Sequence, residues 1–119
     1  MAVQVLGGLT AFAFVEYVTN TDIINAGMST FDSRIFMAEL VGTAVFACGV
    51  ASVVMQKIEG MQAAFTIGAS LFMGILIASM VAPGFLNPAV AIANNSLDRT
   101  TLFAPLIGSV IGMNLYSFF

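Results

Sequence analysis

Three long stretches of the sequence are almost free of charge, and they restrict the chain to one physical environment. They cover residues 35–55, 62–82 and 101–119, and Glu39 is the one acidic or basic residue among them. About 20 helical residues span the ~30 Å hydrocarbon core of a bilayer. Only 8% of the chain is charged, whereas a soluble domain carries about 25%. The sequence therefore predicts an all-α integral membrane protein in which these stretches are three transmembrane helices.

An extra apolar segment precedes this membrane core. Residues 1–18 have no basic residues at their start and no obvious small-residue cleavage site, so we do not interpret them as a signal peptide. Their uncharged run stops at Glu16, which is short for a membrane span. They form either a short transmembrane helix or an interfacial helix in the headgroup plane. Residues 19–33 are polar and predict a linker, which divides the chain into 1–33 and 34–119.

The composition excludes several classes of function. The chain has three basic and six acidic residues, so it lacks the basic footprint of a nucleic-acid-binding protein. It has no histidine, which excludes imidazole catalysis and histidine-ligated metals. The lone cysteine, Cys48, lies in an apolar stretch and is most simply a small buried thiol. We expect no enzymatic activity, no cofactor and no metal site.

A helix predicted over residues 87–95 is too short to cross a membrane. Pro83 and Gly84 end the helix before it, because proline cannot donate to that helix and glycine frees the backbone. Asn87 is a preferred N-cap, and Pro88 suits the first helical position. From there the helix rises only about 12 Å, which is less than half of the hydrocarbon core. The segment is therefore predicted to be re-entrant, with its tip near the midplane and both ends at the same face.

The loop before this half-helix predicts a pore. Backbone groups exposed at that depth are tolerated only where they line a watery cavity or are buried in protein. The carbonyl groups of Pro83, Gly84 and Phe85 would be such groups. A pore that these residues line is the simplest explanation.

One face of the second long stretch is a further candidate for the pore wall. Phe72, Leu76 and Ser79 share this face by their spacing of three and four residues. They could line the pore, with Phe72 as a constriction. Contact with lipid or with another helix explains the pattern nearly as well.

Three motifs follow one another along the membrane core. They are Ala38-Glu39-Leu40-Val41-Gly42-Thr43, then Leu86-Asn87-Pro88-Ala89-Val90, then Ala104-Pro105-Leu106-Ile107-Gly108 followed by Gly112 and Tyr116. In their order and spacing they resemble the major intrinsic protein family, the aquaporins and glycerol facilitators. The resemblance covers residues 34–119 and has no counterpart for the segment before them.

The resemblance implies roles for individual residues. Asn87 would donate its amide N–H groups to a passing water or hydroxyl, and Pro88, Ala89 and Val90 would line the pore beside it. Glu39 would hold backbone N–H groups of the loop, as structural support rather than as a proton carrier.

The chain departs from the family in three respects. The family carries two repeats in inverted orientation, whereas this chain has one. Val90 stands where the second loop of the family usually has an arginine that helps to form the outer filter, and residues 82–85 also differ from the common Ser-Gly-x-His pattern. The resemblance therefore does not imply an arginine filter, strict selectivity for water or the usual exclusion of protons.

One repeat supplies half of a pore wall, so the expected partner is a second copy. We expect a passive channel for water or a small neutral solute such as glycerol, embedded in lipid and completed by self-association as an antiparallel homodimer. Gly108 and Gly112 form a Gly-x-x-x-Gly pair that allows close helix packing, within one protomer or between two. The alternative is a non-conducting structural or accessory membrane subunit with the same half-channel fold.

Overall fold

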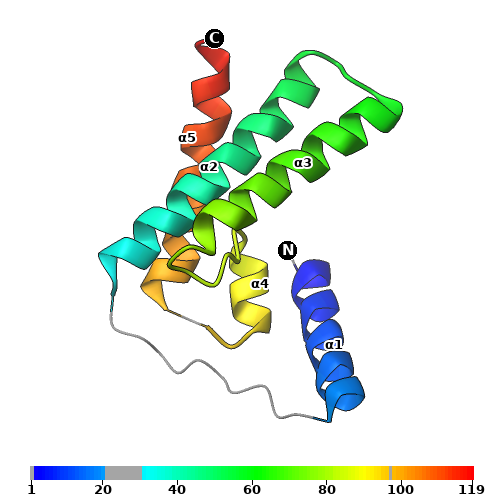
Figure 1. The fold of residues 1–119 in the computed structure, drawn as a ribbon, viewed down its shortest axis with the longest axis vertical. Coiled ribbons are helices and arrows are strands. Elements are labelled where there is room, and N and C mark those ends of the chain that lie inside the picture. The colour runs from blue at the N-terminus through cyan, green and yellow to red at the C-terminus, as the bar shows by residue number, and fades with distance from the viewer. Residues whose placement is uncertain (1, 21–30, 97) are drawn as a thin grey trace.

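The computed structural model describes residues 2–20, 31–96 and 98–119, and this part of the chain is helical with no strand. Five helices follow in order (Figure 1): α1 Ala2–Thr19, α2 Ser33–Met55, α3 Gly60–Ala78, α4 Pro88–Ala93 and α5 Arg99–Ser117. The expectation of an all-α chain is confirmed.

Three of the described helices, α1, α2 and α3, are long and apolar enough to cross a membrane. The sequence predicted this for α2 and α3, and left α1 between a span and an interfacial helix. The third expected span corresponds to α5, which has 19 residues but is not among the three candidates. Its first turn is polar, with Arg99, Thr100 and Thr101, and Asn114 lies near its end. Length and composition thus support membrane insertion through α1, α2 and α3.

Helix α2 is the scaffold against which α3 and α5 pack (Figure 1). The contact with α5 is close, because a Cβ atom on Gly108 would lie 2.4 Å from the carbonyl oxygen of Leu40, and one on Gly112 would lie 2.1 Å from that of Ala44. The residue numbers of these paired positions increase in the same direction along both helices, so α2 and α5 run parallel. At their C-terminal ends Gln56 donates a hydrogen bond to the hydroxyl group of Tyr116.

Helix α3 runs antiparallel to α2 and also meets it through glycine. A Cβ atom on Gly42 would lie 2.6 Å from the carbonyl oxygen of Gly74, and one on Gly74 would lie 2.5 Å from that of Gly42. Further along the same crossing, a Cβ atom on Gly49 would lie 2.3 Å from Cβ of Ser70. The two backbones therefore touch where they cross.

Helix boundaries differ from the predicted ones where side chains cap a helix or the chain turns. The expected helix 62–82 ends at Ala78, because the next amides form turn hydrogen bonds, such as that from Val81 N to Ala78 O at 3.2 Å. The expected half-helix 87–95 is α4, which ends at Ala93 shortly before Asn95, whose φ is 53°. The expected helices 35–55 and 101–119 begin two residues earlier, after aspartate N-caps.

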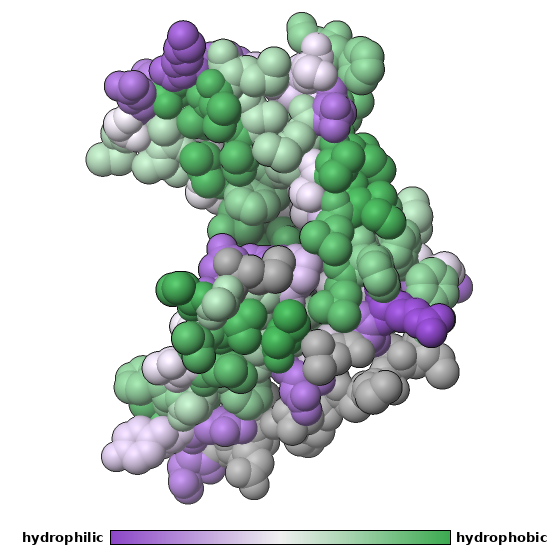
Figure 2. All heavy atoms as spheres, turned by 180° about the vertical axis from the view of Figure 1, so that it is seen from behind, coloured by the Kyte–Doolittle hydropathy of each residue, from purple (hydrophilic) through white to green (hydrophobic). Residues whose placement is uncertain are grey.

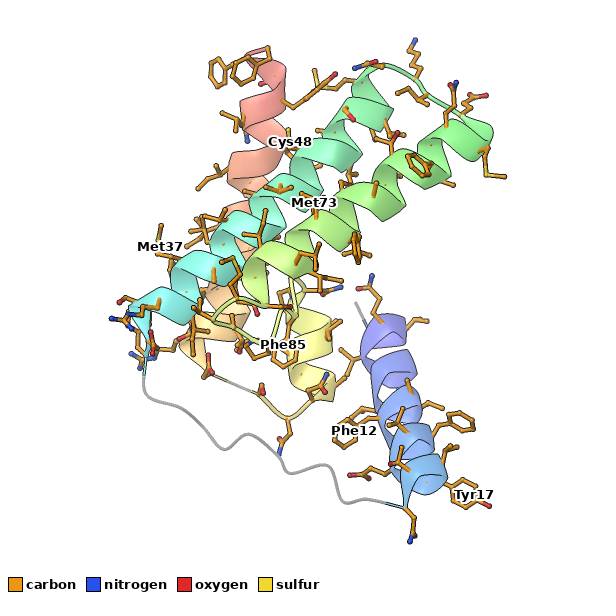
Figure 3. All side chains as sticks on the ribbon, in the orientation of Figure 1. Phe12, Tyr17, Met37, Cys48, Met73 and Phe85 are labelled. Atoms are coloured by element: carbon orange, nitrogen blue, oxygen red, sulfur yellow. The ribbon has the colours of Figure 1, made fainter. Side chains whose placement is uncertain are left out.

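Helix α1 packs beside α4 (Figure 1) and has no buried residue. The contact is between small residues, because a Cβ atom on Gly8 would lie 2.5 Å from Cβ of Ala93. Figure 3 shows Phe12 on the side of α1 that faces α4, and Tyr17 pointing away from it. Most of the predicted polar linker, residues 21–30, lies outside the described residues.

The surface of the described chain is strongly apolar. Figure 2 shows apolar side chains over most of this face, with the polar ones in separate patches. Phe65 is 76% exposed, and Met80 is 81% exposed. Cys48 is half-buried between α2 and α5 rather than fully buried. Exposed apolar surface on this scale suits lipid or another protein as the surroundings.

We expect Gly112→Ala to lower the melting temperature in detergent. The added methyl group would overlap the backbone of Ala44, and overpacking of this kind costs about 1–3 kcal/mol. Gly68→Ala is the matched control, because nothing lies within 4 Å of its Cβ position and alanine favours a helix by up to about 1 kcal/mol. Equal melting temperatures of the two variants would contradict the close packing of α5 on α2.

Candidate functional site

The loop between α3 and α4 is fixed to α2 by one buried carboxylate. Glu39 is fully buried. Its Oε1 atom accepts hydrogen bonds from the backbone N–H groups of Gly84 at 2.8 Å and Phe85 at 3.0 Å, and its Oε2 atom accepts one from Leu86 at 2.9 Å. Burying a carboxylate is costly unless hydrogen bonds replace its water, and bonds to a charged acceptor are the stronger kind. Glu39 therefore holds three consecutive amides of the loop.

Two loop residues adopt left-handed backbone conformations at this point. Gly84 has a φ of 73°, which glycine adopts readily. Leu86 has a φ of 52°, a conformation that costs about 1–3 kcal/mol for a residue with a side chain. Such strain persists only where the surroundings enforce it.

The surroundings of Leu86 supply that enforcement. Its amide is bound by Glu39, and its side chain is only 4% exposed. The side chain lies at the crossing of α2 and α3, where a Cβ atom on Gly42 would be 2.9 Å from Cδ2 of Leu86 and one on Gly74 would be 3.0 Å from Cδ1. The two glycines therefore make room for Leu86, which fixes the direction in which the chain enters α4.

Asn87 is the N-cap of α4. Its Oδ1 atom accepts a hydrogen bond from the backbone N–H of Ala89 at 2.9 Å, and Pro88 occupies the first helical turn. Ala89 is completely buried. Within the part of the chain that the structure describes, no residue accepts a hydrogen bond from Nδ2 of Asn87. The side chain thus uses its oxygen to cap the helix, and its two N–H donors have no acceptor among the described residues.

A cavity of about 240 Å³ lies beside Asn87. Its walls come from α2, from α5, and from the loop with the start of α4. Its lining residues are Thr43, Phe46, Ala47, Val50, Leu86, Asn87, Pro88, Pro105, Leu106, Ser109 and Met113. None of them carries a charge, and Thr43 lies near the middle of α2. The cavity is therefore a mainly apolar space at mid-height of α2 with a free amide donor in its wall.

The structure brings only part of the predicted pore lining to this cavity. Asn87 and Pro88 line it, whereas Pro83 is exposed and Gly84 and Phe85 are half-buried in the loop. Figure 3 shows Phe85 beside α4. Val90 is 39% exposed and lines a second space of about 430 Å³ between α1 and α4.

The predicted α3 face and the glycine pair lie elsewhere. Phe72 is 61% exposed and Leu76 is 49% exposed, and neither they nor Ser79 line the cavity beside Asn87. Gly108 and Gly112 contact α2 of the same chain. The glycine pair therefore serves packing within one chain.

Sequence reasoning missed the α2 and α5 walls. A signal was present on α2, because Thr43, Phe46 and Val50 follow Glu39 at intervals of four, three and four residues, which is the spacing of one helical face. On α5, Pro105 and Ser109 share a face for the same reason. The side of α2 that holds the loop thus continues as the wall of the cavity.

A scan against protein-family models finds no match, and searches of the curated proteins and of the solved structures find no significant one. The function is therefore inferred from the residues, their motifs and their geometry.

We expect Glu39→Leu to destabilise the protein more than Glu39→Gln. Leucine leaves three loop N–H groups unpaired, at about 1–3 kcal/mol each when buried, whereas the single carbonyl oxygen of glutamine retains an acceptor for them. Melting in detergent compares the two variants, and Glu59→Gln at an exposed position without a cap bond is the control. If both Glu39 variants melt at the same temperature, the carboxylate does not support the loop.

Proposed function

We propose that this chain is one half of a membrane pore that conducts water or a small neutral solute passively. A second, antiparallel copy completes the pore. The observation that carries the proposal is the amide group of Asn87. It lines an uncharged cavity, its N–H donors have no acceptor among the described residues, and Glu39 holds the loop beside it.

The order of the helices supports a re-entrant path. Helix α5 runs parallel to α2 and α3 runs antiparallel to it, so α3 ends and α5 begins at the same end of α2. Residues 79–98 therefore leave and return at one end. Helix α2 has 23 residues, or about 34 Å, and Asn87 shares its cavity with Thr43 near the middle of that length. This depth suits a loop tip near the centre of a ~30 Å hydrocarbon core.

The chemistry of the site suits neutral molecules. Selectivity in pores of this kind comes from pore width, from the donors and acceptors that line it and from electrostatic barriers. Asn87 supplies N–H donors, and no residue that lines the cavity is charged. The carboxylate of Glu39 is fully buried and bound to backbone amides. A water or alcohol oxygen can therefore accept from Asn87, while an ion finds no charged group among the lining residues to pair with.

The need for a second copy follows from what one chain provides. Proteins built from inverted repeats place their sites at the repeat interface near the midplane, and this chain has one loop of the required kind. Arg34 and Arg99 begin α2 and α5 at the same end, and Lys57 lies at the other end of α2. Orientation in a membrane follows the bias in such basic residues. Two basic residues at one end against one at the other is a weak bias, which suits a chain that inserts in both directions.

We expect Asn87→Asp to lower water flux at least about tenfold. Aspartate keeps the acceptor that caps α4, but it loses both donors and adds a charge that costs about 2.5–3.5 kcal/mol at the centre of a membrane. Stopped-flow light scattering on proteoliposomes with equal protein content measures the effect.

Asn114→Asp is the matched control for this measurement. Asn114 is exposed on α5 and donates to Val110 O within its own helix, so the same chemical change occurs outside the cavity. Unchanged flux in Asn87→Asp would remove Asn87 from the pore, and absence of flux in the wild type would favour an accessory subunit.

Dual orientation is tested with single cysteines at the two ends of α2. Ser33 and Glu59 are exposed, and each is replaced by cysteine in a Cys48→Ala background. With a membrane-impermeant thiol reagent on intact cells, each site should be about half as reactive as in lysed cells, because half of the chains point each way. Complete labelling of one site and none of the other would refute the antiparallel assembly.

A further inference from the structure

The cavity beside Asn87 is larger than a site for a single water molecule, and its walls suit a particular ligand. We propose that it binds a small neutral aromatic alcohol of the size of phenol. Binding needs only the groups of one chain. That such a ligand would also block permeation rests on the proposed function.

The volume sets the size of the ligand. The cavity measures about 240 Å³. An apolar cavity of about 150 Å³ stays free of water and binds benzene, and a single water occupies about 30 Å³ of liquid. Sites for drug-sized molecules begin at about 300 Å³. One aromatic ring with one or two small substituents therefore fits.

The apolar walls favour an aromatic body. Phe46 and Val50 contribute from α2, and Pro105, Leu106 and Met113 contribute from α5. Aromatic rings pair favourably with one another, edge to face or offset, and the sulfur atom of methionine makes favourable contacts with ring edges. A flat ring can therefore contact both walls at once.

The polar groups match one hydroxyl group. Nδ2 of Asn87 has two donors without an acceptor in the described chain. The hydroxyl of Ser109 donates to Leu106 O at 2.8 Å and that of Thr43 donates to Glu39 O at 2.6 Å, which leaves the lone pairs of both oxygens as acceptors. A ligand hydroxyl can accept from Asn87 and donate to Ser109 or Thr43.

The absence of charge among the lining residues excludes a charged analogue. A carboxylate would enter without a cation to pair with it, which is unfavourable in an apolar space. Phenols resemble the tyrosine side chain and are neutral at pH 7. The site should therefore discriminate 4-fluorophenol from 4-fluorobenzoate.

The test measures binding of 4-fluorophenol to the purified protein in detergent. Fluorine NMR monitors the ligand. The reference ligand is 4-fluorotoluene, which has the same shape but a methyl group in place of the hydroxyl. Empty micelles correct for partition into detergent. We expect 4-fluorotoluene to bind about three- to tenfold more weakly, which is the range for one net hydrogen bond, and 4-fluorobenzoate not to bind.

Three variants identify the site. Asn87→Asp removes the donors and should abolish the preference for the phenol. Ser109→Leu and Val50→Phe fill the cavity from α5 and from α2 respectively, and either should abolish binding of both ligands. Thr66→Leu on α3 lies outside the cavity and should change nothing. Melting temperatures show which variants are folded, and the two filling variants substitute for each other if one is not.

The outcomes separate this inference from the proposed function. Equal affinity of the wild type for the phenol and the toluene, or unchanged binding in a folded cavity-filling variant, would overturn the inference even if the protein conducts water. Binding that depends on Asn87 in a protein without water flux would support the inference and refute the channel.

Discussion

The hydrogen bonds from three loop amides to the Glu39 carboxylate are the interaction on which the rest of the site depends. The bonded residues are 45 to 47 positions apart in the sequence, and the bonds join the second turn of α2 to the loop after α3. A buried carboxylate without partners would be too costly to retain, and unpaired loop amides would be nearly as unfavourable. Each therefore satisfies the other. This anchor positions the residues that come next in the chain. They are Leu86 with its left-handed backbone and Asn87, which caps α4 and lines the cavity.

Close backbone contact explains why α2 can serve as a scaffold for both α3 and α5. In lipid, apolar side chains gain little from contact with one another, so helices associate through tight packing of small residues. Gly42 and Gly74 supply that packing towards α3, and Gly108 and Gly112 supply it towards α5. The two contacts lie near the middle of α2, and the cavity lies at the same level, beside α5 and the loop.

The sequence predicted the features that depend on local chemistry. Apolar length predicted α2 and α3, and Asn87 followed by Pro88 predicted the start of α4. The resemblance implied that Glu39 holds loop amides, and its hydrogen bonds have that form. The sequence could not predict the end of α3 at Ala78, the left-handed Leu86 or the wall that α5 gives to the cavity. Each of these depends on contacts between residues far apart in the chain, which propensity and spacing do not encode.

Leu86 lies against Gly42 and Gly74, so the position of the loop is coupled to the distance between α2 and α3. Its methyl groups lie against the crossing of the two backbones, so a change in the tilt or separation of the helices would change the space that Leu86 occupies. Its neighbour Asn87 would then move with it, since the intervening backbone is held at both ends. Lateral tension and bilayer thickness act on the tilt of membrane helices. A change in the tilt or spacing of α2 and α3 would therefore displace the amide group of Asn87.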